Sequence, residues 1–144
     1  MALIEGPPAV ESLLPHRDPM RLVRVIVEVA AGHDRIHCIA VIPPDNPLAD
    51  GDRAPAFLGL EAAAQAAAAL EALARREGDP GPRLGYLVGV RDAIFHAPDL
   101  PVAVPLAVTV RAAGSAPPLA VYEARVEQDG AALVTGTIST YVLS

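Results

Sequence analysis

Two polar side chains in an otherwise apolar run are the first residues of this chain whose types and spacing could do chemistry. Glu61 and Gln65 interrupt the alanine-rich stretch 57–69. They are four residues apart, so they share one face if the stretch is helical. A carboxylate on a buried helix needs a partner or a chemical task, because burying an unpaired charge is costly. Glu61 is therefore the first candidate for a catalytic group.

A second interpretation of the same pair stays open at this point. Glu61 falls in the first two turns of the expected helix, where the helix dipole favours a negative charge. A helix that is only partly buried would show both Glu61 and Gln65 to solvent. The elements around this stretch have to decide between the two interpretations.

The helix itself is predicted from alanine content, length and start signal. Pro55 suits the first helical position, where the missing N–H costs nothing, and we expect the helix to end near Arg76, before Gly78. The run is apolar on every side except at Glu61 and Gln65, which is typical of a buried helix. The loop before it, 44–53, feeds directly into the helix, as functional loops often do.

β-like runs make up most of the remaining chain. The expected strands are 20–30, 33–42, 83–96, 102–112, 119–127 and 131–143. Ile36, Cys38 and Ala40 alternate onto one face, and Asp129-Gly130 is a strong hairpin signal. The sum predicts an α+β protein of one domain, 1–144, in which an antiparallel sheet wraps around one long apolar helix.

Composition excludes several classes of function. The net charge is −6 and no cluster of Lys and Arg suits a phosphate backbone, so nucleic acid is not an expected partner. Cys38 is the only cysteine, which excludes an internal disulfide and favours a buried structural thiol over a nucleophile. Cys/His zinc spacing is absent, and no metal is expected. No apolar run approaches the length of a membrane span and no leader is evident, so we expect a cytoplasmic protein.

A family resemblance follows from two motifs in order along the chain. The segment Leu14-Pro15-His16-Arg17-Asp18-Pro19-Met20 and the helix start Pro55-x-x-x-x-x-Glu61-x-x-x-Gln65 resemble the hotdog-fold 3-hydroxyacyl-acyl-carrier-protein dehydratases of fatty acid synthesis. Pro55-Ala56-Phe57-x-Gly59-x-Glu61-x-x-Ala64-Gln65, Gly85-Tyr86-Leu87-x-Gly89-x-Arg91 and Pro101-Val102 are similar to the dehydratase-like branch of aryl-polyene pathways.

The resemblance implies a hotdog fold, an acyl carrier protein bearing an acyl thioester as partner, and no cofactor. It also implies a dimer whose sheets join edge to edge, with acyl tunnels between the subunits. In such dehydratases a loop His acts with an acidic residue on the partner's helix. Glu61 matches the acidic position, but the chain has Asn46-Pro47-Leu48-Ala49 where the His-Phe-Pro-Gly loop would stand.

Dehydration requires a base for the C2 proton, an acid for the C3 hydroxyl and donors for the thioester oxygen. We assign Glu61 as the acid and His16 as the substitute base, with Asp50 and Asp52 as other candidates for the base. Backbone N–H groups near Ala56 and Phe57, at the helix N-terminus, suit an oxyanion. Gln65 completes the predicted site by holding Glu61 in place.

Two alternatives to a dehydratase remain. A non-catalytic hotdog subunit would bind the acyl carrier or pair with an active paralogue, and the missing loop His favours this alternative. We expect a homodimer, with a heterodimer formed with a paralogue as the alternative. A thioesterase would instead use the helix carboxylate to activate water.

Overall fold

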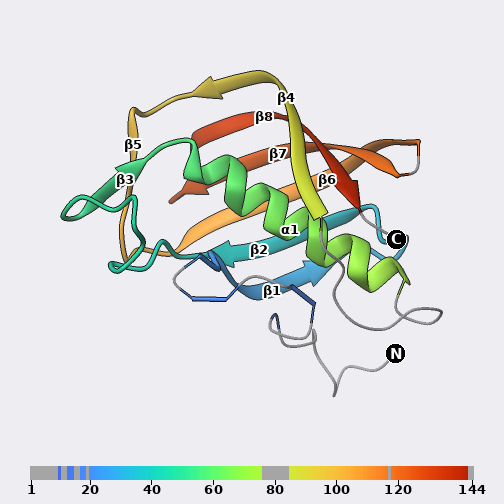
Figure 1. Cartoon of the computed structure of the whole chain (residues 1–144), viewed down its shortest axis with the longest axis horizontal. Coiled ribbons are helices and arrows are strands. Elements are labelled where there is room, and N and C mark those ends of the chain that lie inside the picture. The colour runs from blue at the N-terminus through green and yellow to red at the C-terminus, as the bar shows by residue number, and fades with distance from the viewer. Residues whose placement is uncertain are drawn as a thin grey trace.

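Alternating apolar residues build one antiparallel sheet around a single helix (Figure 1). The computed structural model describes residues 10, 13–14, 17–18, 20–75, 85–116 and 118–142. Within these ranges the elements are, in order, β1 (Val23–Val29), β2 (Arg35–Ala40), β3 (Arg53–Pro55), α1 (Leu58–Arg75), β4 (Gly85–Phe95), β5 (Asp99–Pro101), β6 (Leu106–Ala116), β7 (Leu119–Gln128) and β8 (Ala131–Val142).

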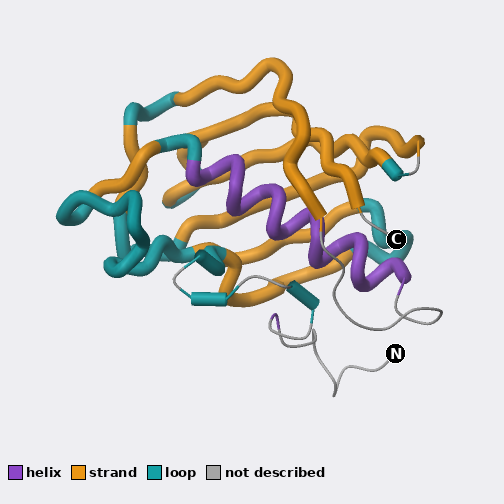
Figure 2. Tube along the Cα trace, in the orientation of Figure 1, coloured by secondary structure: helices purple, strands orange, loops and turns teal. Residues whose placement is uncertain are grey.

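The main sheet has six strands in the order β1-β2-β6-β7-β8-β4, and every neighbouring pair is antiparallel. Strands β1 and β4 are its two edges. Figure 2 shows α1 lying across one face of this sheet, and the helix contacts all six strands. A separate two-stranded sheet, β3 with β5, lies beside the start of α1. The predicted α+β architecture, a sheet wrapped around one helix, is confirmed.

The core is aliphatic and rich in alanine, as the composition requires. Six alanines of α1 are at most 4% exposed: Ala62, Ala63, Ala66, Ala67, Ala69 and Ala72. Their short side chains let the helix axis come close to the sheet. On β2, Ile36, Cys38 and Ala40 all face this core, so the predicted alternation is confirmed.

The hairpin between β7 and β8 is also confirmed. Asp129 and Gly130 connect the two strands and have φ angles of 52° and 83°. Two positive φ angles in succession are characteristic of the turn type whose twist matches antiparallel strands. Strands β3 and β5 were not predicted, because three residues containing a proline carry almost no alternation signal.

The start of the helix differs from the prediction. Pro55 is the last residue of β3, where it pairs with Asp99, and α1 begins only at Leu58. The pairing of Ala54 with Leu100 holds the chain extended at this point, and residues 56–57 turn it into the helix. The placement of Pro55 at the first helical position was therefore wrong.

The burial of Cys38 leads to a prediction about its reactivity. The residue is 0% exposed, and burial raises the pKa of its thiol from 9.0 to about 12. Since the thiolate is the reactive form, iodoacetamide should leave the folded protein unmodified at neutral pH and alkylate the urea-unfolded chain. Mass spectrometry distinguishes the two results. Equal alkylation of the folded and unfolded protein would contradict the burial.

The same thiol should make stability fall in alkaline solution. The unfolded chain loses this proton above pH 9, whereas the folded chain keeps it up to about pH 12. The contribution is therefore fully present below pH 9 and declines at higher pH, by roughly 1.4 kcal/mol per pH unit between these values. Urea unfolding at pH 8 and pH 10, with Cys38→Ala as the reference that lacks the thiol, measures the difference.

Candidate functional site

Glu61 lies in the first turn of α1, at the end of the helix that meets the small sheet. Its side chain is half-buried, and its N–H donates to Phe57 O at 3.4 Å. The small sheet is held in place by Arg53, whose Nε donates to Asp99 Oδ1 at 2.7 Å and whose Nη2 donates to Asp99 O at 3.1 Å. The carboxylate thus stands at a fixed helix terminus.

Backbone N–H groups converge at this terminus. Gly59 N–H donates to Ala56 O and Leu60 N–H donates to Phe57 O, both at 2.9 Å. These bonds leave the N–H groups of Phe57 and Leu58 without an acceptor within the described ranges. Free N–H groups and the positive end of the helix dipole favour an oxyanion. Ala56 is buried, whereas the Phe57 side chain is 51% exposed.

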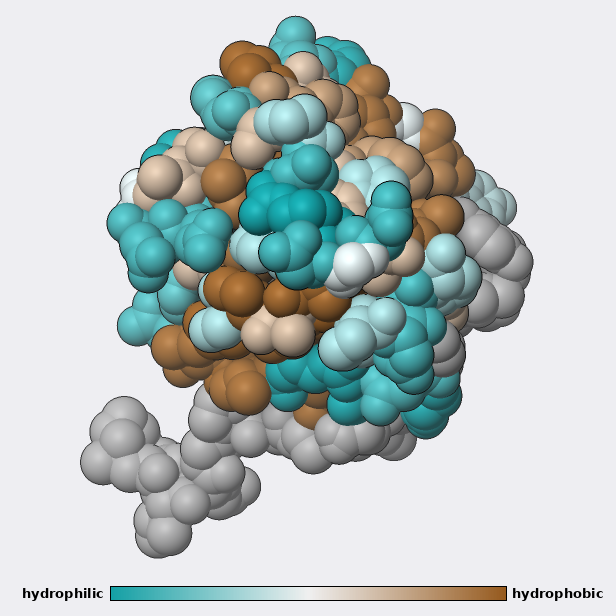
Figure 3. Space-filling view, turned by 90° about the vertical axis from the view of Figure 1, so that its left-hand side faces the viewer, coloured by the Kyte–Doolittle hydropathy of each residue, from teal (hydrophilic) through white to brown (hydrophobic). Residues whose placement is uncertain are grey.

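Figure 3 looks onto this end of the molecule, and hydrophobic surface there lies directly beside hydrophilic surface. The apolar character agrees with the exposed side chains of Phe57 and Leu48, which is 43% exposed. Exposed apolar side chains therefore lie near the start of α1.

Gln65 is fully buried, which rules out the interpretation that both polar residues of the helix face solvent. Its Oε1 accepts hydrogen bonds from the N–H groups of Leu22 and Val23, and its Nε2 donates to Met20 O. All three partners belong to the chain entering β1. These hydrogen bonds run to the start of β1 and none of them joins Gln65 to Glu61, so the role of Gln65 in holding Glu61 stays a prediction.

The candidate bases lie in different environments. His16 falls outside the described residues. Asp50 and Asp52 are exposed on the turn that precedes β3, where the Asp50 N–H donates to Arg53 O at 2.8 Å. The structure therefore brings neither aspartate into a buried contact with the helix.

Asn46 is a buried polar residue that the sequence analysis did not single out for a role. It is 4% exposed, and its Oδ1 accepts a hydrogen bond from Leu48 N–H at 2.9 Å. It stands in the loop where the resembling dehydratases carry their His. The Asn-Pro dipeptide was a turn signal, and nothing in that signal indicated burial.

Several charged side chains lie just before β1 and at its start. Arg24 Nη1 contacts Asp18 Oδ1 at 2.6 Å, and Arg17 Nη1 donates to Leu14 O at 2.7 Å. The hydrogen bond from Arg24 lowers the pKa of Asp18, and the charges of Arg24 and Arg21 lower it further.

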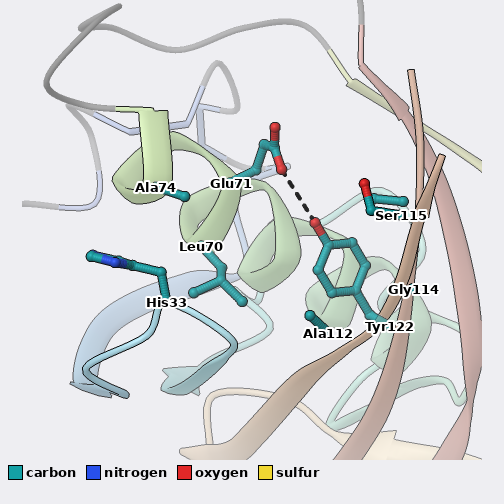
Figure 4. Close-up of a pocket in the computed structure, with 9 residues that line it drawn as sticks. His33, Leu70, Glu71, Ala74, Ala112, Gly114, Ser115 and Tyr122 are labelled. Atoms are coloured by element: carbon teal, nitrogen blue, oxygen red, sulfur yellow. Dashed lines mark hydrogen bonds between the residues drawn. The ribbon is translucent and has the colours of Figure 1, made fainter. Parts of the chain in front are cut away.

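A cavity of about 120 Å³ lies at the opposite end of α1 (Figure 4). Tyr122 Oη donates to Glu71 Oε2 there at 3.5 Å, and His33 lines the other side. None of the predicted site residues that the structure describes lines this cavity. Glu71 is ten residues from Glu61, or roughly 15 Å along the helix, so the cavity is separate from the candidate site.

The described part of the chain contains neither a metal site nor a membrane-spanning helix. No group of three or more His, Cys, Asp and Glu side chains could hold a metal ion there. No helix in those residues is both long and apolar enough to cross a membrane.

Comparison with known structures defines the class of the protein. The chain superposes on a chain of the dehydratase heterocomplex ApeI:P from Xenorhabdus doucetiae with a TM-score of 0.84, at 24% identity, covering 96% of this chain and 93% of that one. A mutant thioesterase from Pseudomonas aeruginosa matches with a TM-score of 0.60, at 12% identity, covering 84% and 81%. The fold is the hotdog fold, as the resemblance implied.

The family follows from the sequence. The model of the ApeP-like family, described as ApeP dehydratase, matches residues 8–144, and the chain belongs to this family. A 3-hydroxyacyl-[acyl-carrier-protein] dehydratase, FabZ, from Anaeromyxobacter dehalogenans is 34% identical over 97 residues, which are 64% of this chain and 62% of that protein. The match therefore spans less than two thirds of the length of that curated relative.

The helix backbone at Gly59, two residues before Glu61, packs closely against β8, so that adding one methyl group there would cause a clash. A Cβ added at Gly59 would lie 2.9 Å from Val134 Cγ2 and 3.3 Å from Val134 Cβ, and a β-branched side chain has little freedom to yield. We predict that Gly59→Ala lowers the free energy of unfolding by about 1–3 kcal/mol. Gly114→Ala is the matched control, because a Cβ there meets nothing within 4 Å. Chemical denaturation measures both, and equal stabilities would contradict the close packing.

Proposed function

We propose that this chain is a dehydratase subunit that removes water from 3-hydroxyacyl chains carried on acyl carrier protein. The observation that carries the proposal is the half-buried Glu61 residue in the first turn of α1, next to the N–H groups of Phe57 and Leu58, for which the described residues supply no acceptor. Membership of the ApeP-like dehydratase family and the FabZ relative support the same chemistry. The proposal treats 1–144 as one domain.

The proposed reaction is an elimination across C2 and C3 of the thioester. A base removes a C2 proton, the electrons form the C2–C3 double bond, and the C3 hydroxyl leaves as water with a proton from Glu61. The N–H groups at the start of α1 stabilise the negative charge that develops on the thioester oxygen. Proton transfers suffice and no oxidation state changes, so the proposal includes no cofactor. His16 is the proposed base.

Glu61→Gln tests this assignment. The variant keeps the shape of the side chain but cannot give up a proton, so turnover should fall at least about 100-fold while the fold is retained. The assay follows the ultraviolet absorbance of a trans-2-enoyl thioester on its carrier, which hydration in the reverse direction bleaches. Glu71→Gln is the matched control, since it makes the same change on the same helix and should keep activity. Unchanged turnover in Glu61→Gln would overturn the role of Glu61.

The thioesterase alternative has its own signature in the same experiment. Release of free carrier thiol without loss of the enoyl absorbance would replace the dehydratase by a hydrolase that uses Glu61 to activate water. The hotdog likeness to a thioesterase from Pseudomonas aeruginosa bears on the fold alone.

We further propose that the chain works as a dimer joined along β4. This edge strand is eleven residues long and carries four exposed apolar side chains: Val88, Val90, Ile94 and Phe95, at 55%, 40%, 54% and 46% exposure. A long apolar edge strand is a template for pairing with another sheet. A second copy would give a homodimer, and a hotdog paralogue would give a heterodimer; the ApeI:P dehydratase is itself described as a heterocomplex.

Lysine substitutions on β4 test the dimer. The double variant Val88→Lys/Ile94→Lys should halve the mass found by sedimentation equilibrium, because edge charges prevent strand pairing. Val27→Lys is the control, since Val27 is 49% exposed on β1, the other edge of the sheet. An unchanged mass in the double variant, or dissociation in the control alone, would contradict pairing along β4. A wild-type chain that turns over substrate only after mixing with a paralogue would select the heterodimer.

A further inference from the structure

The cavity at the far end of α1 has buried residues at its floor and exposed residues at its rim (Figure 4). Leu70 and Tyr122 form the floor and are 2% and 4% exposed. His33, Ala74 and Ser115 are exposed and form the rim. The volume of about 120 Å³ is close to that of a protein cavity of about 150 Å³ that binds benzene. The cavity therefore has room for one small ring, which can enter from solvent.

The polar groups at the floor can bind one more hydroxyl group. Tyr122 Oη donates to Glu71 Oε2 across 3.5 Å, which is long for two oxygen atoms, whose usual separation is about 2.7–2.8 Å. A carboxylate offers about four acceptor sites, and a hydroxyl group both donates and accepts. A ligand hydroxyl can therefore accept from Tyr122 and donate to Glu71, alongside the other partners of these two residues.

A β-bulge in β6 makes space in one wall of the cavity. The register of β6 with β7 shifts between Ala112 and Gly114, directly after the pair that Ala112 forms with Tyr122. Gly114 lines the cavity, and a Cβ added there would meet nothing within 4 Å. Bulges bend their strand and are common beside functional sites. Together with the missing side chain at Gly114, this bulge leaves room beside Tyr122.

The turn between β1 and β2 forms the opposite wall, on the side of His33 in Figure 4. His33 has a φ angle of 56°, in the left-handed region that few residues other than glycine adopt. Its N–H donates to Ala30 O at 2.9 Å, and Ala112 N–H donates to Asp34 O at 2.7 Å. Since these bonds tie the turn to β6, the two walls are held at a fixed separation. The cavity is thus preformed, as small-molecule sites usually are.

We propose that this cavity is a binding site for a small neutral ring that carries a hydroxyl group, of which phenol is the simplest example. The ring lies beside Leu70 and Gly114, and its hydroxyl lies between Tyr122 Oη and Glu71. An anion is disfavoured, because the Glu71 carboxylate and the negative end of the α1 dipole are both close. The site is roughly 15 Å along the helix from Glu61, so it depends neither on the acyl carrier nor on the proposed elimination.

An NMR titration of the wild-type protein with phenol tests the location. The backbone amide signals of Ala112, Ser115 and Ala120 should shift together, with a dissociation constant of about 1 mM, as expected for a ligand of so few atoms. Leu48 and Phe57 are the internal control, since they expose apolar side chains at the other end of α1. Shifts confined to Leu48 and Phe57, or the absence of any saturable shift, would overturn the inference without the need for a variant.

Tyr122→Phe tests the recognition of the hydroxyl group. Toluene has the size of phenol but no hydroxyl, so the wild type should bind phenol at least about fivefold more tightly than toluene. Tyr122→Phe should lose most of this preference and keep the wild-type affinity for toluene, because the ring of the side chain remains. Equal affinity of the wild type for phenol and toluene would overturn the role of the hydroxyl. Tighter binding of benzylamine, a cation at neutral pH, would overturn the choice of a neutral ligand.

Gly114→Leu tests whether the ligand occupies the cavity. The added side chain enters the open space beside Tyr122, so the affinity for phenol should fall at least about tenfold. Ala131→Leu is the matched control, because it adds the same side chain at an exposed position of β8 and should leave the affinity unchanged. Wild-type affinity in a folded Gly114→Leu protein would overturn the inference. Loss of binding in Glu61→Gln would do so too, because it would place the ligand at the other end of the helix.

Discussion

The close packing of an alanine-rich helix against six strands is the constraint on which the rest of this structure depends. Ala63 and Ala66 are fully buried, and Gly59 leaves no room for a methyl group against Val134. A helix held this close has no space for a longer side chain along its inner faces. Polar chemistry is therefore confined to the helix terminus and to positions where the sheet itself supplies partners.

Gln65 and Glu61 illustrate the two solutions. Gln65 lies in the middle of the packed face and is tolerated because three backbone groups entering β1 satisfy its amide. Glu61 lies one turn earlier and is half-buried, at the end of α1 that lies beside the separate sheet of β3 and β5. The same helix face thus carries a structural amide and a candidate acid, and the two side chains differ in how deeply they are buried.

The sequence predicted those features whose cause is local. Alternation at Ile36, Cys38 and Ala40 predicted a buried strand face, and Asp129-Gly130 predicted a hairpin, because each signal lies within a few residues. The predicted start of the helix was wrong because Pro55 pairs with Asp99, and no local sequence pattern indicates a contact between such distant segments. The partners of Gln65 were missed for the same reason.

The candidate site was predicted only in part, and the reason lies in side-chain placement. The spacing of Glu61 and Gln65 placed both residues on one helix face and suggested burial, but not which backbone groups would meet the amide. Asn46 was passed over as a loop residue, although it is 4% exposed. Resemblance supplied the family and the expected roles, whereas the hydrogen bonds of these side chains required coordinates.

This chain lacks the loop His of the resembling dehydratases, and that difference determines how many active sites a dimer could have. An amide such as Asn46 does not titrate near neutral pH and cannot act as the base. In the resembling dehydratases the acid and the loop His come from different subunits. A homodimer of this chain would then place Glu61 opposite Asn46 in both sites and would need His16 as the base. A heterodimer with a paralogue that carries the His would place Glu61 opposite that His in one of its two sites only. Counting catalytic sites per dimer therefore separates a base within this chain from a base supplied by a partner.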